Sequence, residues 1–119
     1  MSGNWRVKGT LLQPAELLFT GGDHRALVCV LIEQPGGLPV LACLPYGDSG
    51  SAHYVAGAAA KRLTKGMRVE AHGDGVKLDR HRGQQVLRLM LVDHIGSLEA
   101  QADHTRHERL ERETETAEA

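Results

Sequence analysis

Short runs that alternate apolar and polar residues, separated by glycine-bearing turns, constrain this chain more than any other feature. In residues 5–12, Val7 and Leu11 fall on one face, whereas Arg6 and Lys8 fall on the other. A period of two residues is typical of a strand with one buried face. The same alternation, or a β-rich apolar run, marks four further segments: 25–33, 38–44, 67–73 and 85–95. The pattern therefore predicts a mainly β domain of five strands.

One segment breaks the β pattern. Residues 52–63 are rich in alanine, and their apolar side chains recur at three- and four-residue spacing, which predicts one short helix. Ser51 is placed to cap its start and Gly66 to end it. A helix between the third and fourth of five strands is the order of an OB-fold (oligonucleotide-binding) barrel. A five-stranded α+β domain of another kind is the alternative.

Charge is distributed unevenly along the chain. Residues 1–98 carry 11 Lys and Arg against 8 Asp and Glu, and residues 99–119 carry 3 against 7. The body is thus mildly basic and the end acidic, which suits a protein that handles a polyanion. Hydrophobic residues nearly vanish in the second part, so we expect one domain over 1–98 and an acidic tail, helical or disordered, over 99–119.

The two cysteines, Cys29 and Cys43, both lie inside apolar runs. We expect them to be small buried side chains that stay reduced, in preference to a disulfide or a metal site. The chain has no secretory segment and no apolar run long enough to span a bilayer. These features predict a soluble, cytoplasmic protein with no membrane partner.

Three groups of residues carry a resemblance to a known family: Val7–Leu11 with Pro14–Leu17 and Phe19–Gly22; Ala59–Val69 with Gly73; and Gly83 with Leu87–Leu89 and Asp93–Ile95. In order and spacing they resemble the opening, the helix end with the fourth strand, and the final strand of the bacterial single-stranded DNA-binding protein family. The primosomal replication protein N subgroup is an equally close comparison, since the insertion at Tyr46–Asp48 before a short helix resembles that subgroup. The resemblance covers residues 5–98. It implies an OB fold that binds single-stranded DNA, assembles as a homodimer or homotetramer and contacts replication proteins.

Two departures from that family change the expected mechanism. The chain has only four aromatic residues of the Trp, Phe and Tyr type: Trp5, Phe19, Tyr46 and Tyr54. Its acidic end, residues 111–119, lacks the Pro-Phe tip through which the family recruits partners. That recruitment mechanism is therefore not carried over.

Binding of single strands without sequence preference needs cations for the phosphates and flat side chains for the bases. With few aromatics, this chain must depend mainly on charge. The predicted nucleic-acid-binding residues form three groups. They are the strand cations Arg6, Lys8, Arg25 and Arg88; the residues Lys77, Arg80, His81 and Arg82 of a basic arm between the last two strands; and Tyr46 on a glycine-flanked loop. An ordinary solvated hairpin is the alternative for the arm. Trp5, Phe19 and Tyr54 are expected to pack rather than stack on bases.

No motif for catalysis appears. The sequence contains no nucleophile elbow, P-loop, HExxH motif or dinucleotide-binding glycine fingerprint. His104 and His107 lie three apart, but no cysteine or carboxylate completes a zinc set around them. We therefore expect a protein that is not an enzyme and has no cofactor and no metal. It would bind single-stranded DNA in replication, repair, recombination or DNA transfer, with RNA left open. The alternative is an OB-type scaffold or primosome-type interaction component with weak DNA affinity.

Overall fold

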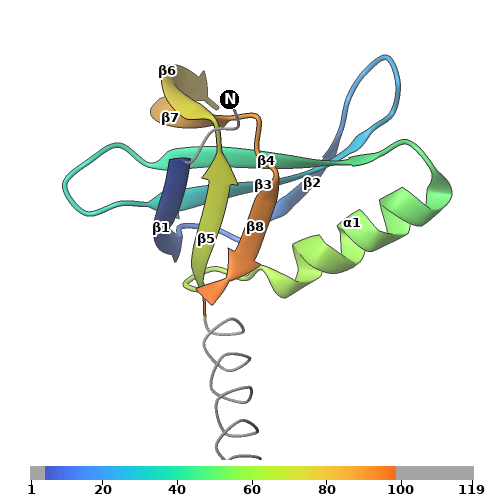
Figure 1. Ribbon diagram of the computed structural model, residues 1–119, viewed down its shortest axis with the longest axis horizontal. Helices are drawn as coiled ribbons and strands as arrows, with labels where there is room; N and C mark the ends of the chain where they lie inside the picture. Colours follow the sequence, from blue (N-terminus) through green and yellow to red (C-terminus); the bar gives the residue numbers. More distant parts are fainter. Residues whose placement is uncertain (1–4, 99–119) are drawn as a thin grey trace, which may run out of the picture.

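The computed structural model describes residues 5–98 (Figure 1). Its elements, in chain order, are β1 (Trp5–Leu11), β2 (Glu16–Phe19), β3 (Ala26–Glu33), β4 (Val40–Gly47), α1 (Gly50–Arg62), β5 (Arg68–Gly73), β6 (Gly75–His81), β7 (Gln84–Met90) and β8 (His94–Ser97). In this part of the chain no helix is long and apolar enough to cross a membrane. The predicted tail over 99–119, with its two histidines, lies outside the described residues.

All eight strands belong to one mixed sheet, in the order β6-β7-β4-β3-β1-β5-β8, with β2 paired to β3. Most pairs are antiparallel, but β4 and β7 run parallel where Val40 and Leu41 face Leu87 and Arg88. In Figure 1, β1, β5 and β8 lie side by side and cross the long β3 and β4 strands, while α1 runs below them. The sheet is strongly bent and is not closed into a barrel.

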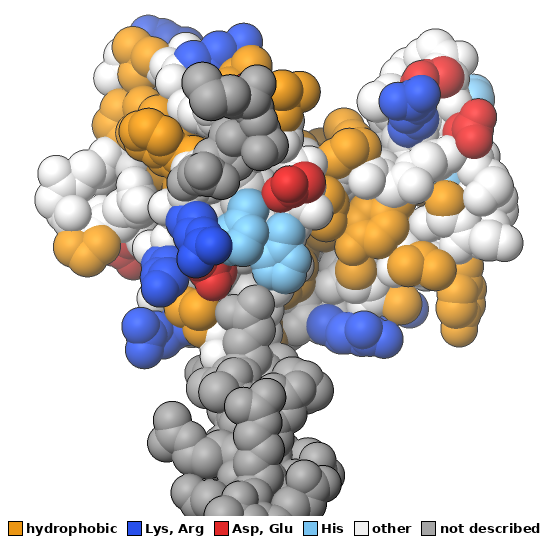
Figure 2. Space-filling view, in the orientation of Figure 1, with side chains coloured by type: hydrophobic (Ala, Val, Ile, Leu, Met, Phe, Trp, Pro, Cys, Tyr) orange, Lys and Arg blue, Asp and Glu red, His pale blue; other side chains and the backbone are white. Residues whose placement is uncertain are grey.

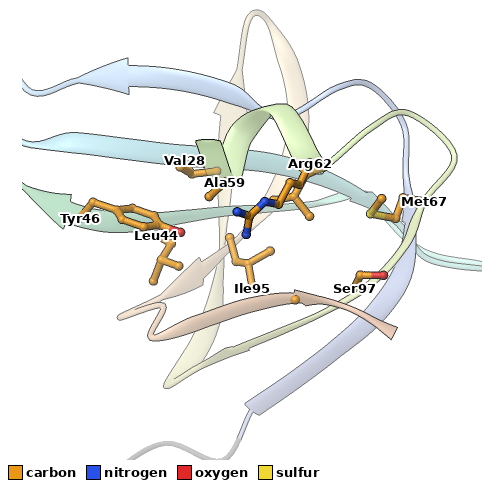
Figure 3. Close-up of a pocket in the computed structure, with 10 residues that line it drawn as sticks. Val28, Leu44, Tyr46, Ala59, Arg62, Met67, Ile95 and Ser97 are labelled. Atoms are coloured by element: carbon orange, nitrogen blue, oxygen red, sulfur yellow. The ribbon is translucent and has the colours of Figure 1, made fainter. Parts of the chain in front are cut away.

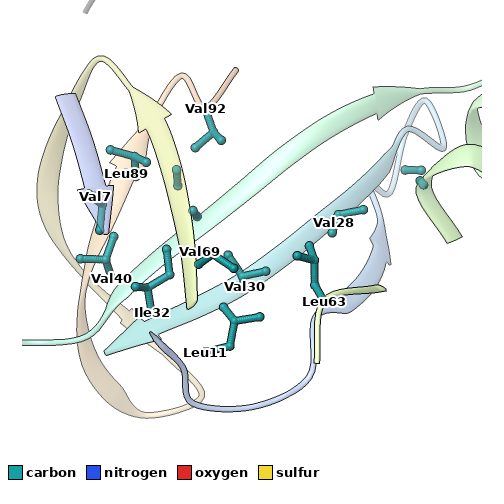
Figure 4. Close-up of a cluster of buried hydrophobic side chains, with 14 residues drawn as sticks. Val7, Leu11, Val28, Val30, Ile32, Val40, Leu63, Val69, Leu89 and Val92 are labelled. Carbon is teal, nitrogen blue, oxygen red and sulfur yellow. The ribbon is translucent and has the colours of Figure 1, made fainter. Parts of the chain in front are cut away.

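Strand β3 is apolar from Ala26 to Ile32, and side chains cover both of its faces along this stretch. Its side chains at Val28, Val30 and Ile32 enter the main core, shown in Figure 4, together with side chains from β1, β5 and α1. The alternate residues Cys29 and Leu31 enter a second apolar cluster on the opposite face. That cluster is completed by Leu41 of β4 and Val86 of β7.

Gly9 lies where β1 passes from one neighbour to the other. Most of β1 pairs with β5, but its last two residues pair with the end of β3. The backbones approach so closely that a Cβ atom added at Gly9 would lie 2.2 Å from the carbonyl oxygen of Glu33 and 2.6 Å from Ile32 Cγ2. Only glycine fits here without displacing the end of β3.

The mainly β architecture with one helix is confirmed, but the expectation of a five-stranded barrel is wrong in its strand count and closure. The segment expected as one final strand is two strands, β7 and β8, interrupted where Leu91 adopts a φ of 50°. At this break the chain leaves β4 and joins β5. The short connection after β1 forms β2, and the arm contributes β6.

The ends of α1 also differ from the sequence-based expectation. Ser49, not Ser51, caps the helix, because its side chain accepts a hydrogen bond of 3.0 Å from the backbone N–H of Ala52. The helix ends at Arg62 with Leu63 as its cap. Gly66, at a φ of 87°, forms the following turn, where its N–H donates to the carbonyl of Leu11.

Candidate nucleic-acid interface

The cations predicted on the first strand do lie on an exposed sheet face. Arg6 and Lys8 point away from the core side of β1 and are exposed. Residues directly opposite each other in a ladder share a face, and the register places Arg6 beside His72 and Lys8 beside Glu70. We call this surface the β1–β5–β8 face, and define it by Arg6, Lys8, Arg68, Glu70, His72 and His94.

Three cations of this face are free of acidic partners within the described residues. Arg6, Lys8 and Arg68 form no ion pair there, although Glu70 faces Lys8 across the ladder. Figure 2 shows Lys and Arg side chains beside two adjacent histidines on the front of the molecule. Three cations against one carboxylate, Glu70, leave the face with an excess of positive charge, which attracts anions.

A buried carboxylate, Glu70, lies beside one of the two histidines, His72. Glu70 is only 7% exposed, and its Oε1 atom is 3.2 Å from Nε2 of His72. The rings of His72 and His94 have centroids 4.7 Å apart. Nε2 of His94 is buried and has no hydrogen-bond partner among the described residues.

A hollow of about 470 Å³ adjoins this face where β1 ends. It is lined by Lys8, Gly9, Thr10, Glu33, Pro35 and Arg68. Two of the three free cations, Lys8 and Arg68, therefore border one depression together with the carboxylate of Glu33.

The basic arm is a hairpin, as predicted, formed by β6 and β7. Its turn is at Arg82 and Gly83, which have φ values of 53° and 79°. Lys77 and Arg88 face each other across the hairpin. Arg80 and the half-buried His81 occupy the outer strand β6 toward the turn, opposite residues at the start of β7.

The arm is folded onto the sheet, which neither interpretation of the sequence anticipated. Arg82 at its tip forms an ion pair with Glu16 at the start of β2. Since β4 and β3 separate β7 from β2 in the sheet order, the hairpin must curl over these two strands to make this contact. Val86 consequently lies fully buried against the second apolar cluster.

Two arginines predicted to bind nucleic acid are thus occupied by carboxylates within the arm and its docking site. Besides the Arg82 pair, Nε of Arg88 is 2.6 Å from Oδ2 of Asp79. The backbone N–H of Arg80 and the Arg88 side chain hold the pKa of Asp79 below its ordinary value. In the arm, only Lys77 and Arg80 present cationic side chains without an ion pair among the described residues.

The structure does not bring Arg25 and Tyr46 to this surface. Arg25, in the β2–β3 connection, pairs with Asp23 at 3.1 Å. Tyr46 is a strand residue, not a loop residue, because β4 continues to Gly47 and pairs there with β3. Its ring is half-buried against the main core and lines a pocket of about 300 Å³ with Arg62 and Met67 (Figure 3).

Aromatic exposure also differs from expectation. Tyr54, expected to pack, is 80% exposed on α1. Phe19 and Trp5 are each about half exposed, and the Phe19 ring meets the His53 ring edge-on at 4.9 Å. None of these aromatic rings forms a row with the free cations of β1 in the strand register.

Sequence reasoning missed Arg68, His72 and His94 as members of the site. The alternation of residues 67–73 places Arg68 on the same face as His72. What the alternation could not reveal is that β5 pairs with β1 and β8, which brings the three side chains beside Arg6 and Lys8. The sequence matches no protein-family model, and no curated protein is significantly similar to it.

Proposed function

We propose that this chain is a non-enzymatic binding protein for single-stranded nucleic acid, with DNA as the principal ligand and the β1–β5–β8 face as the contact surface. The observation that carries the proposal is the set of three exposed cations, Arg6, Lys8 and Arg68, with no ion pair among the described residues. Lys77 and Arg80 of the arm are secondary contacts.

The connectivity supports an OB-type assignment. A meander of β1, β3 and β4 is followed by α1 and β5, and the last segment pairs with both β4 and β5. These pairings support an OB-type assignment in which the final strand is broken at residues 91–93 and two strands are additional, β2 and the arm strand β6. The sequence resemblance to bacterial single-stranded DNA-binding proteins and primosomal replication protein N agrees with this assignment.

The mechanism would be largely electrostatic. Cations that neutralise phosphates release condensed counterions, and for single strands the logarithm of affinity falls by about 0.7 per phosphate for each tenfold rise in salt. Three phosphate contacts therefore predict a slope of about −2. No aromatic row lies along the face, so base stacking contributes little, and we expect weak sequence preference.

The test is fluorescence anisotropy of a labelled oligothymidine, titrated with the full chain at several salt concentrations. The Arg6→Glu/Lys8→Glu variant should lose most of its affinity and reduce the salt slope by about two contacts. Its matched control is Lys61→Glu/Lys65→Glu, which makes the same change in net charge on exposed positions around the end of α1.

An equal loss of affinity in both double variants would assign binding to net charge and refute the site. Absence of binding by the unmodified chain at low salt would refute the function. A labelled oligouridine of equal length compares RNA with DNA.

A protein-interaction scaffold is the second candidate, and one observation favours it. Exposed apolar side chains lie at the end of β2 and on the neighbouring α1 helix: Phe19, Tyr54 and Val55. A surface of this kind suits a protein partner better than a polyanion. If oligothymidine does not bind, this patch becomes the first target for mutation.

A further inference from the structure

The two cysteines lie directly opposite each other in the sheet. Cys29 of β3 and Cys43 of β4 are register partners in an antiparallel ladder, so their side chains share one face. Opposed residues in such a ladder have Cα atoms about 4.5–5.5 Å apart, which is within the range that a disulfide spans. Both thiols are free.

The surroundings of the two thiols are unequal. Cys29 is 4% exposed within the second apolar cluster, whereas Cys43 is half-buried. Cys43 also lines a pocket of about 450 Å³. Arg88 lines the same pocket, and Cys29 does not. A small solute can therefore reach Cys43 from the pocket.

The pKa values of the two thiols shift in opposite directions, in the same sense as their exposure and access to the pocket. The hydrogen bond from Cys29 and the nearby Arg88 guanidinium lower the pKa of Cys43, against the opposing effect of burial. The same hydrogen bond and burial raise the pKa of Cys29. Since the thiolate is the nucleophile, Cys43 is the sulfur that reacts first.

We propose that Cys29 and Cys43 form a redox-active dithiol, which hydrogen peroxide entering the pocket beside Arg88 converts to an intrachain disulfide. The Cys43 thiolate attacks one peroxide oxygen, the O–O bond breaks, and hydroxide leaves while Cys43 becomes a sulfenic acid. The Cys29 sulfur then attacks the Cys43 sulfur, the S–S bond forms, and the S–O bond breaks. The Cys29 proton leaves with that oxygen as water.

The reaction balances without any further reactant. The two thiols lose two electrons and two protons, and the peroxide is reduced to two molecules of water. A dithiol reductant reverses the change by thiol–disulfide exchange. The proposal goes beyond nucleic-acid binding and does not depend on it.

The test treats the folded full chain with hydrogen peroxide, then alkylates remaining thiols and measures the intact mass. We expect a mass loss of two hydrogen atoms, no alkylation at either cysteine, and recovery of both thiols after treatment with dithiothreitol. The Cys29→Ala variant should stop at the sulfenic acid, which dimedone traps on Cys43. In the Cys43→Ala variant, Cys29 should resist both peroxide and alkylation while the protein is folded.

Two further measurements use the unmodified chain, so they test the proposal even if a variant folds poorly. In the unmodified chain, peptide mapping after brief iodoacetamide treatment should find the label on Cys43 and not on Cys29. The alkylation rate should reach half its maximum at a pH below the value for an ordinary cysteine. Survival of both thiols in peroxide, direct oxidation to sulfinic acid, or disulfides that join two chains on a non-reducing gel would each overturn the proposal.

Discussion

Replacing Gly9 with alanine tests the close crossing of β1 and β3 most directly. The new Cβ would lie 2.2 Å from the Glu33 carbonyl oxygen, whereas ordinary van der Waals contacts begin near 3.4 Å. A displacement of about 1 Å is needed to relieve the contact, and the obstacle is backbone that cannot rotate away like a side chain. The residue after Gly9 pairs with Glu33, so the displacement must disturb the ladder itself.

The expected cost follows from two opposing effects. Overpacking of a well-packed interior destabilises by about 1–3 kcal/mol, and a rigid backbone obstacle places Gly9→Ala at the upper end. Alanine also lowers the conformational entropy of the unfolded chain, which stabilises the folded state by about 0.4–1 kcal/mol. The net loss should be about 2 kcal/mol, equivalent to a fall in Tm of about 8–16 °C for a domain of this size.

Urea denaturation followed by circular dichroism measures this difference, with an unchanged m-value as evidence that the unfolded state is unaffected. Gly21→Ala is the matched control, since an added Cβ there meets nothing within 4 Å. It carries the same entropic gain without the collision, so it should be neutral or slightly stabilising. If the free energies of unfolding of Gly9→Ala and Gly21→Ala differ by less than about 0.5 kcal/mol, the close approach of β1 to β3 does not require glycine at position 9.

Three further predictions concern the helix cap, the core and the arm. Ser49→Ala should cost about 1 kcal/mol in urea denaturation, whereas Ser51→Ala should cost little because its side chain caps nothing. Leu11→Ala should cost about 2–5 kcal/mol because its side chain is fully buried, and Leu78→Ala on the exposed face of the arm should stay within about 0.5 kcal/mol. The pKa of Asp79 is lowered first by the Arg80 backbone N–H and then by Arg88, so the stabilisation from both contacts is fully present above the ordinary aspartate range and is lost as pH falls through the lower folded value. The Asp79 carboxyl chemical shift should therefore titrate below 3.8, and a normal titration would show that these contacts do not form in solution.

Local patterns predicted the elements better than their pairing. The alternation of β1 correctly placed Arg6 and Lys8 on the face opposite the core, because strand geometry alone decides which side chains share a face. The alanine-rich segment gave the helix, but two serines near its start, Ser49 and Ser51, satisfy the same capping pattern. Only the backbone conformation decides between them, and it favours Ser49.

The rest of the site depends on contacts between segments far apart in the chain. No local pattern shows that Arg82 meets Glu16, that Val86 covers the second apolar cluster, or that the final segment divides between β4 and β5. Tyr46 illustrates the same limit, because its flanking glycine suggested a loop while the pairing of β4 with β3 extends to that glycine. Long-range pairing is chosen by total burial and hydrogen bonding, which a window of neighbouring residues does not contain.

The break between β7 and β8 has a consequence for how the protein is made. These two strands are neighbours in sequence, yet they lie at opposite sides of the sheet, where β7 pairs with β4 and β8 pairs with β5. The meander of β1, β3 and β4 can pair as soon as it leaves the ribosome. One edge of β4 and one edge of β5, however, have no strand to pair with until β7 and β8 have been synthesised. During synthesis the chain therefore exposes incomplete strand edges, and its final folding step must follow release of residues 84–97 from the exit tunnel.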